Sequence, residues 1–375
     1  MIAEQDGVTR VLTNLIRGAR ERGHEVMCVA SALPKKELQY IPMLKVPSVY
    51  APGRTEYRIA LPGYRWFKEE VLAWKPDIMH IHSPDPLGFA AAKFGREYGI
   101  PVVATYHTHF PTYVQYYLDV KWEDRVWRML RRLYNQLDAT FVPALSVLEE
   151  IREMGMRRTE YLPNAVNTSA FSPKYRSDAW RESVGAKDKQ IVLFTSRFVW
   201  EKNLKTLSAT YEILREKRND FVMVCVGDGP ARKKWQPTMP GAHFTGWLDG
   251  EPLSTSYASS DIFVFPSISE TFGLVTTEAM ASGLAPAAAR AGGAADIIRH
   301  EQSGLLAERD DPYSLAESVE RLLDNPELRK SIVENAKIRA TEFEWEPMFN
   351  QLFHRYEEII GEQGASNREA LRLAR

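Results

Sequence analysis

Cysteine is scarce in this chain, and long apolar runs are missing. The only two cysteines, Cys28 and Cys225, lie inside short apolar runs. We therefore expect buried thiols and neither a disulfide framework nor a cysteine metal cluster. No window approaches the roughly 20 apolar residues of a membrane-spanning helix, and residues 1–8 lack a signal-peptide pattern. These absences predict a cytoplasmic protein that contacts the inner face of the membrane at most peripherally.

An excess of positive charge is missing as well. The 48 Lys and Arg residues are balanced by 49 Asp and Glu residues, which gives a formal net charge of -1. This balance argues against a general nucleic-acid binder. With 375 residues, of which 44% are hydrophobic and 26% charged, the chain is long enough for two domains with full cores.

Short apolar runs alternate with helical patterns along the whole chain. The expected strands are residues 25–30, 77–82, 102–106 and 139–142, followed by 191–195, 220–226, 243–245, 261–265 and 285–289. Such alternation is typical of parallel α/β sheets. We predict two Rossmann-like domains, residues 1–170 and 171–346, that face each other across a cleft. A C-terminal helix over about 347–362 is expected to pack back on the first domain.

The start of the first domain is expected to be incomplete. The turn Asp6-Gly7-Val8 leads directly into a helix over residues 9–22. A doubly wound domain normally has a strand before such a glycine turn, and this strand is usually central in the sheet. Only residues 1–5 precede the turn here. The sequence therefore predicts that the first strand of the N-terminal domain is missing.

Residues 266–283, P-S-I-S-E-T-F-G-L-V-T-T-E-A-M-A-S-G, form the most informative stretch. A buried strand over 262–265 precedes it, and a helix is expected to begin near Leu274. A strand that leads through a loop into a helix N-terminus makes an anion site, because free N–H groups and the helix dipole point toward it. Glu270 and Glu278 would flank a phosphate held there. Two hydroxyl-binding carboxylates beside a phosphate suit a sugar nucleotide.

Several motifs occur in a fixed order along the chain. They are Asp6-Gly7-Val8, His107 after a strand, Pro163-Asn164, Arg197 with Glu201-Lys202-Asn203, Gly227-Asp228-Gly229-Pro230, and Glu270 to Glu278. Each motif alone is weak, but in this order and spacing the chain resembles GT-B glycosyltransferases, specifically glycosyltransferase family 4. The resemblance covers nearly the whole chain apart from the missing first strand. The chain looks most like the lipid-directed mannosyl- and sulfoquinovosyl-type members.

Arg197 and Lys202 follow the strand over residues 191–195. Two cations at the carboxyl end of a strand can neutralise a diphosphate, and their contacts strengthen as the leaving nucleotide gains charge. The alternative is a solvated basic turn. The resemblance implies the phosphate role, without a metal. It also implies that Glu270 binds hydroxyls of the donor sugar and that Glu278 binds those of the ribose.

The resemblance extends to further residues of the donor and acceptor sites. His107 matches a histidine that lines the sugar site, and the predicted catalytic residues are His107, Arg197, Lys202 and Glu270. The predicted donor-binding residues are Gly7, Arg197, Lys202, Gly227, Asp249, Glu270, Thr271, Phe272, Gly273, Leu274 and Glu278. His82, Asp85 and His109 are candidates for the acceptor side. We expect no metal site, on the view that His80 and His82 face opposite sides of a strand.

The donor and the acceptor are predicted from weaker patterns. Asp249 could pair with the N1–H edge of guanine, so GDP-mannose is the first choice of donor and a UDP-hexose is close behind. Residues 57–75 and 113–134 are both basic and aromatic, which is typical of helices at an anionic lipid surface. A core-facing helix with a solvated basic side is the alternative. A lipid or glycan acceptor and a peripheral contact with anionic membrane are therefore expected.

The sequence and the resemblance together predict a retaining glycosyltransferase. It would move a hexose from a nucleotide-diphosphate sugar to a lipid or glycan hydroxyl, with phosphate-assisted attack from the front face and no cofactor beyond the donor itself. Two alternatives are a sugar-nucleotide epimerase of the UDP-sugar 2-epimerase type and a non-catalytic protein that binds a nucleotide sugar.

Overall fold

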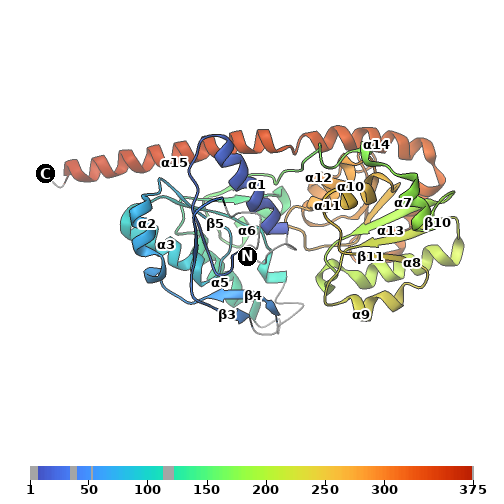
Figure 1. Cartoon of the computed structure of the whole chain (residues 1–375), viewed down its shortest axis with the longest axis horizontal. Helices are drawn as coiled ribbons and strands as arrows, with labels where there is room; N and C mark the ends of the chain where they lie inside the picture. The colour runs from blue at the N-terminus through green and yellow to red at the C-terminus, as the bar shows by residue number, and fades with distance from the viewer. Residues whose placement is uncertain (1–6, 34–39, 52–53, 113–121, 374–375) are drawn as a thin grey trace.

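The computed structural model describes residues 7–33, 40–51, 54–112 and 122–373. Two α/β halves lie side by side, and one long C-terminal helix runs along the N-terminal half (Figure 1). Within the described part of the chain, no helix combines the length and apolar character that crossing a bilayer requires. The predicted α/β fold with parallel sheets is confirmed.

The N-terminal half contains parallel strands in two separate sheets. Strands β1 (Cys28–Ala30) and β2 (Met43–Lys45) form one sheet, and β5 (Met79–Ile81), β6 (Val102–Thr105), β7 (Ala139–Val142) and β8 (Thr159–Tyr161) form the other, in this order. Among the described residues, no strand joins the two sheets. An antiparallel hairpin of β3 (Ser48–Ala51) and β4 (Arg54–Ala60) is added, which the sequence analysis did not predict. The helices are α1 (Gly7–Glu21), α2 (Lys68–Trp74), α3 (Pro86–Tyr98), α5 (Glu123–Tyr134) and α6 (Leu145–Glu153).

The C-terminal half is one six-stranded parallel sheet of order β11-β10-β9-β12-β13-β14. Its strands are β9 (Gln190–Thr195), β10 (Phe221–Val226), β11 (His243–Gly246), β12 (Ile262–Phe265), β13 (Ala285–Ala289) and β14 (Leu305–Ala307). Its helices are α7 (Asp178–Ser183), α8 (Leu204–Lys217), α9 (Arg232–Trp235), α10 (Gly250–Ala258), α11 (Leu274–Ala281), α12 (Gly292–Ile297), α13 (Pro312–Asp324) and α14 (Pro326–Thr341). The strand order reverses between β9 and β12, and ligands bind outside the carboxyl ends of the strands at such a switch point.

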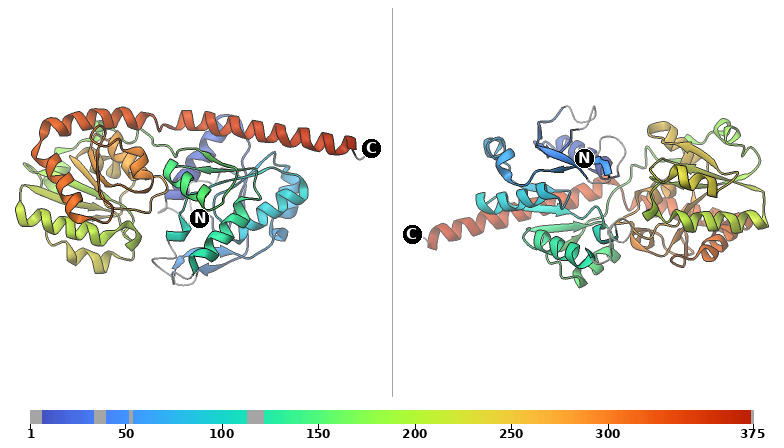
Figure 2. Two further views of the ribbon diagram at one scale, coloured as in Figure 1. Left: turned by 180° about the vertical axis from the view of Figure 1, so that it is seen from behind. Right: turned by 90° about the horizontal axis from the view of Figure 1, so that it is seen from below.

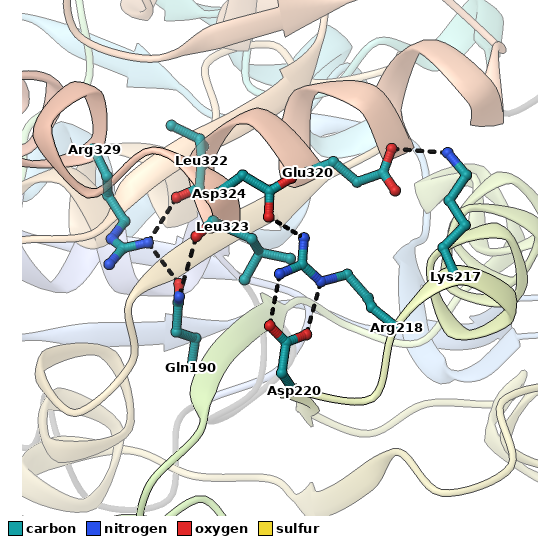
Figure 3. Close-up of polar contacts among 9 residues, drawn as sticks. All are labelled: Gln190, Lys217, Arg218, Asp220, Glu320, Leu322, Leu323, Asp324 and Arg329. Carbon is teal, nitrogen blue, oxygen red and sulfur yellow. Dashed lines mark hydrogen bonds and ion pairs between the residues drawn. The ribbon is translucent and has the colours of Figure 1, made fainter.

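At the amino ends of these strands, charged side chains hold the neighbouring helices to the sheet (Figure 3). Arg218, which follows α8, donates to both carboxylate oxygens of Asp220 and to Asp324 at the end of α13, each at 2.7 Å. Arg329 of α14 donates to Gln190, the first residue of β9, at 2.5 Å. These contacts hold helices α8, α13 and α14 to the ends of the strands. They lie away from the carboxyl edge and have a structural role.

The chain crosses between the halves twice, and the two crossings lie against each other. The amide of Val166 on the outward crossing donates to the carbonyl of Phe343 on the return at 2.7 Å, and Thr168 donates to the Glu344 carboxylate at 2.6 Å. After the return, α15 (Trp345–Leu373) runs along the N-terminal half in all three views (Figures 1 and 2). Its residues Phe349 and Leu352 share a buried cluster with strand residues of that half.

Candidate donor site at the domain junction

The loop between β12 and α11 is built for close approach of backbone groups. Gly273 has φ 101° and caps the start of α11, so the first N–H groups of this helix lie at the carboxyl edge of the sheet. The next glycine-rich loop packs directly on it, since a Cβ on Gly293 would lie 2.1 Å from the carbonyl oxygen of Phe272. The Gly293 amide also donates to the Glu270 carbonyl at 2.9 Å. Residues 270–274 are therefore held in one conformation.

Lys202 and Glu270 meet between two loops at this edge. The Lys202 ammonium forms an ion pair with the Glu270 carboxylate, which also accepts a hydrogen bond from Ser267 at 2.9 Å. The loops themselves are joined, because Ser269 donates to the Glu201 carbonyl at 2.9 Å and Asn203 donates to the Pro266 carbonyl at 3.2 Å. The E-K-N motif thus places its lysine beside the loop carboxylate.

Arg197 lies in the segment that follows β9, and the G-D-G-P turn packs against that segment. Gly227 has φ 130°, and a Cβ there would lie 1.9 Å from the Ser196 carbonyl oxygen. The Phe198 amide donates to the Asp228 carbonyl at 2.9 Å. The glycine is required at this point by both its backbone conformation and the contact, so the turn fixes the backbone on both sides of Arg197.

Glu278 is buried on α11, with both carboxylate oxygens bonded. Oε1 pairs with the Arg10 guanidinium of α1 at 3.0 Å, and Oε2 accepts from the Tyr257 hydroxyl at 3.0 Å. Burial raises the pKa of Glu278, and Arg10 and Tyr257 oppose this rise. The pKa of Arg10 is raised by Glu278 first, with Asp249 as a further nearby negative charge. Arg10 and Tyr257 were not predicted as site residues, although Arg10 follows Gly7 by one helical turn.

The two domains touch at this site. The Thr271 hydroxyl donates to the backbone carbonyl of His107 at 2.6 Å. Gly7, the first residue of α1, lies opposite the start of α11, where a Cβ would be 3.9 Å from Leu274 Cδ1. Two helix N-termini therefore meet at the junction, one from each domain, and both favour an anion.

Three buried histidines of the N-terminal domain lie together, and one of them, His107, contacts the junction through its backbone carbonyl. His82 Nδ1 lies 2.9 Å from His107 Nε2, and His80 bonds to Thr105 Oγ1 at 2.8 Å and to the Tyr356 hydroxyl. Burial lowers the pKa of His107 to about 4 and that of His80 to about 3, so these rings are neutral at pH 7.

The expectation that His80 and His82 face opposite sides is wrong. Their ring centroids are 4.0 Å apart, because residues two apart in a strand share a face. Among the described residues, no cluster of His, Cys, Asp or Glu has the arrangement of a metal site.

The other two acceptor candidates have structural contacts. Asp85 caps α3 by accepting from the Gly88 amide at 3.0 Å, and burial raises its pKa. His109 bonds Thr112 of its own segment at 2.6 Å and Glu150 of α6 at 3.1 Å. Asp85 also lines a cavity of the N-terminal domain, whereas His109 is held by its neighbours in the same domain.

This cavity, of about 1310 Å³, lies in the N-terminal domain between residues 62–65, α3 and α5. We call it the basic groove, because its charged lining consists of one carboxylate, Asp85, and the cations Arg65, Lys93, Arg96, Arg125, Arg128 and Arg132. The two basic and aromatic stretches of the sequence meet here, together with α3, which the sequence analysis did not implicate. Helix α5 buries Trp127, Leu130 and Leu133 and leaves Met129 exposed, as is Trp122 just before the helix. The helix therefore both faces the core and lines the groove.

Comparison with known proteins agrees with this architecture. Residues 5–170 match the model of Glycosyltransferase Family 4, and residues 176–339 match that of Glycosyl transferases group 1. A GDP-mannose-dependent alpha-mannosyltransferase of Corynebacterium glutamicum is 31% identical, with 95% of this chain and 86% of the relative covered. A sulfoquinovosyl transferase of Arabidopsis thaliana is 33% identical, with 88% of this chain covered; the match spans 66% of that relative's length. The structure of Anabaena HepE in complex with UDP superimposes with a TM-score of 0.77 at 18% identity, covering 95% of this chain and 97% of HepE.

The two facing α/β domains and their likeness to that solved structure define a protein of the GT-B fold. The mannosyltransferase relative and the two matched domain models identify it further: the chain belongs to glycosyltransferase family 4. The fold and family predicted from the ordered motifs are confirmed.

Proposed function

We propose that this protein is a retaining glycosyltransferase that moves a hexose, mannose in the first place, from a nucleoside-diphosphate sugar to a hydroxyl group of a lipid or glycan. One observation carries the proposal: Lys202, Glu270 and the first amides of α11 gather at the carboxyl edge of β9 and β12. Glu278 lies on the same helix. A diphosphate bound there would contact the Lys202 ammonium and the first amides of α11. Glu270 and Glu278, one on each side, would accept hydrogen bonds from hydroxyl groups.

The proposed reaction needs positive charge where the nucleotide leaves. The acceptor oxygen bonds to the anomeric carbon on the face from which the β-phosphate oxygen departs, and that phosphate takes the acceptor's proton. Arg197 and Lys202 would stabilise the charge that grows on the diphosphate, assisted by the N-termini of α1 and α11. We propose that these groups act without a metal. The neutral His107 beside Thr271 would line the sugar pocket.

GDP-mannose is the proposed donor, with a UDP-hexose as the second choice. The Corynebacterium glutamicum relative is named as GDP-mannose-dependent. Asp249 is a negative charge in the neighbourhood of Arg10, and we propose that it reads the guanine base. The UDP-bound structure of HepE supports the second choice only through the shared fold. A donor panel separates the two bases.

A lipid acceptor at an anionic membrane surface is supported by the basic groove. Its cations and the exposed side chains of Trp122 and Met129 lie on the N-terminal domain. Cationic and aromatic groups of this kind bind the interfacial region of anionic bilayers. We propose peripheral contact through this surface, which would bring the acceptor hydroxyl to the domain that carries His82 and His107.

The test is nucleotide release from a panel of GDP- and UDP-sugars, with and without membrane lipid extract. We expect release with one donor, dependent on the extract, and a new glycolipid with retained anomeric configuration. Conversion of a UDP-sugar without extract would instead indicate an epimerase. Donor binding without release under any condition would indicate a non-catalytic binding protein. Either result would overturn the proposal.

A further inference from the structure

Both oxygens of the buried Glu278 carboxylate are already bonded. Its Oε1 is paired with Arg10 at 3.0 Å, and its Oε2 holds the Tyr257 hydroxyl at 3.0 Å. The side chain of Glu278 is only 5% exposed. A ribose that presents its hydroxyls to this carboxylate therefore competes for it with one of the two partners.

Tyr257 is the partner that stays. It is fully buried in the core of the C-terminal domain, and its ring packs edge-on against Phe171 at 5.5 Å between centroids. Arg10 belongs to the opposite domain, and its side chain is 45% exposed. Its long side chain can leave without opening a cavity in either core. The exchangeable contact of Glu278 is therefore the one that Arg10 makes.

The surroundings of Arg10 suit a diphosphate. Arg10 lies one turn into α1, whose first residue Gly7 faces Leu274 at the start of α11. A guanidinium at this point can bind two phosphate oxygens in parallel, which a lysine cannot do. The start of α11 lies beside Gly7, and helix N-termini favour an anion. When a donor is bound, the diphosphate of that donor is therefore close enough to pair with an Arg10 that has left Glu278.

We propose that Arg10 is a donor-binding residue that exchanges partners. It pairs with Glu278 while the site is empty, yields that carboxylate to the ribose hydroxyls, and then pairs with the diphosphate of the bound donor. This inference rests on the proposed nucleotide-sugar site. While the site is empty, Arg10 compensates the charge of a carboxylate whose burial would otherwise be costly. It also couples the two domains to donor binding, because Arg10 and Glu278 lie on different domains.

The exchange predicts opposite effects on two ligands that differ only in phosphate. A nucleoside competes with Arg10 for Glu278 and has no phosphate with which Arg10 could pair. A nucleoside diphosphate competes in the same way but provides Arg10 with a new partner. In Arg10→Met the nucleoside is therefore expected to bind as tightly as in the wild type or tighter. The nucleoside diphosphate is expected to lose at least about tenfold in affinity, the scale of one charge-assisted contact.

The experiment is calorimetric titration of the full chain with guanosine, GDP, uridine and UDP, for the wild type, Arg10→Met and Arg10→Lys. Arg17→Met on the exposed face of α1 is the matched control and is expected to bind like the wild type. Arg10→Lys keeps the charge without the planar fork and should retain part of the diphosphate affinity, so it preserves the test if Arg10→Met folds poorly. Equal changes for nucleoside and diphosphate, or none, overturn the exchange alone. If the wild type binds none of the four ligands, the proposed donor site fails, and the exchange fails with it.

Discussion

Lys202 on the loop after β9 and Glu270 on the loop after β12 hold each other in an ion pair at the carboxyl edge of the C-terminal sheet. Both side chains are largely shielded from solvent, 22% and 14% exposed. In the proposed reaction the lysine would face phosphate and the carboxylate would face sugar hydroxyls. Each group therefore fixes the position of the other before a donor arrives, which lowers the ordering cost of binding.

The first prediction concerns Lys202. Lys202→Ala is expected to lower kcat by about 100- to 1,000-fold, the usual effect of removing one donor that stabilises developing charge. The fold should survive, because the loop is also held by Ser269 and Asn203. Nucleotide release at saturating donor measures the effect. Lys205→Ala, on the exposed side of α8, is the control. Wild-type turnover in Lys202→Ala would refute the assignment.

The second prediction concerns Gly227. A Cβ at this position would lie 1.9 Å from the Ser196 carbonyl oxygen, and the backbone has φ 130°. Gly227→Ala should therefore lower the free energy of unfolding by about 3 kcal/mol or more and disturb Arg197. Gly185→Ala is the control, since Gly185 also has positive φ but has nothing within 4 Å; it should cost about 1 kcal/mol. Equal losses in denaturant titrations would contradict the steric argument.

The third prediction concerns pH. Because burial lowers the pKa of His80 to about 3, the folded state binds fewer protons than the unfolded state below the ordinary histidine pKa of about 6.5. Stability should fall as the pH drops from about 6.5, by about 1.4 kcal/mol per pH unit for each such group. His80→Asn should make this decline less steep between pH 6.5 and 5, measured by denaturant unfolding. His354→Asn, on the exposed surface of α15, should keep the wild-type slope; identical slopes in both variants would refute the prediction.

The fourth prediction concerns the basic groove. Charge reversal at Arg125, Arg128 and Arg132 should weaken binding to phosphatidylglycerol vesicles by about 100-fold or more, since each basic residue contributes about 1 kcal/mol at an anionic surface. Binding to phosphatidylcholine vesicles should be weak in all variants. Charge reversal at Lys205, Lys233 and Lys234 of the C-terminal domain is the matched control. An equal loss in the control would mean that the effect is one of net charge and not of the groove.

The sequence was informative wherever function and local structure share the same short segment. The loop around Glu270, the start of α11 and the E-K-N motif could be located because each follows a buried strand and has turn or helix-start residues. The ordered motifs also identified the fold and the family. These features depend on neighbours in the chain, which a single sequence displays.

Contacts between distant segments could not be predicted in the same way. The pairing of Arg10 with Glu278 joins helices from two domains, and the hydrogen bond of Thr271 with the His107 carbonyl also spans both. The hairpin of β3 and β4 was missed although the sequence has the turn-forming pair Pro52-Gly53 between the two strands. The prediction that His80 and His82 lie on opposite faces was wrong for a different reason. The sequence shows that they are two residues apart in a strand, and such residues share a face.

The return of the chain to its first half sets an order for folding during synthesis. The sheet of residues 190–307 and its helices are continuous in sequence, so this unit can form as soon as it leaves the ribosome. The buried cluster around Val103 and Phe141 instead needs Phe349 and Leu352 of α15, which emerge more than 200 residues after Phe141. The half of the protein that is made first is therefore the last to be completed.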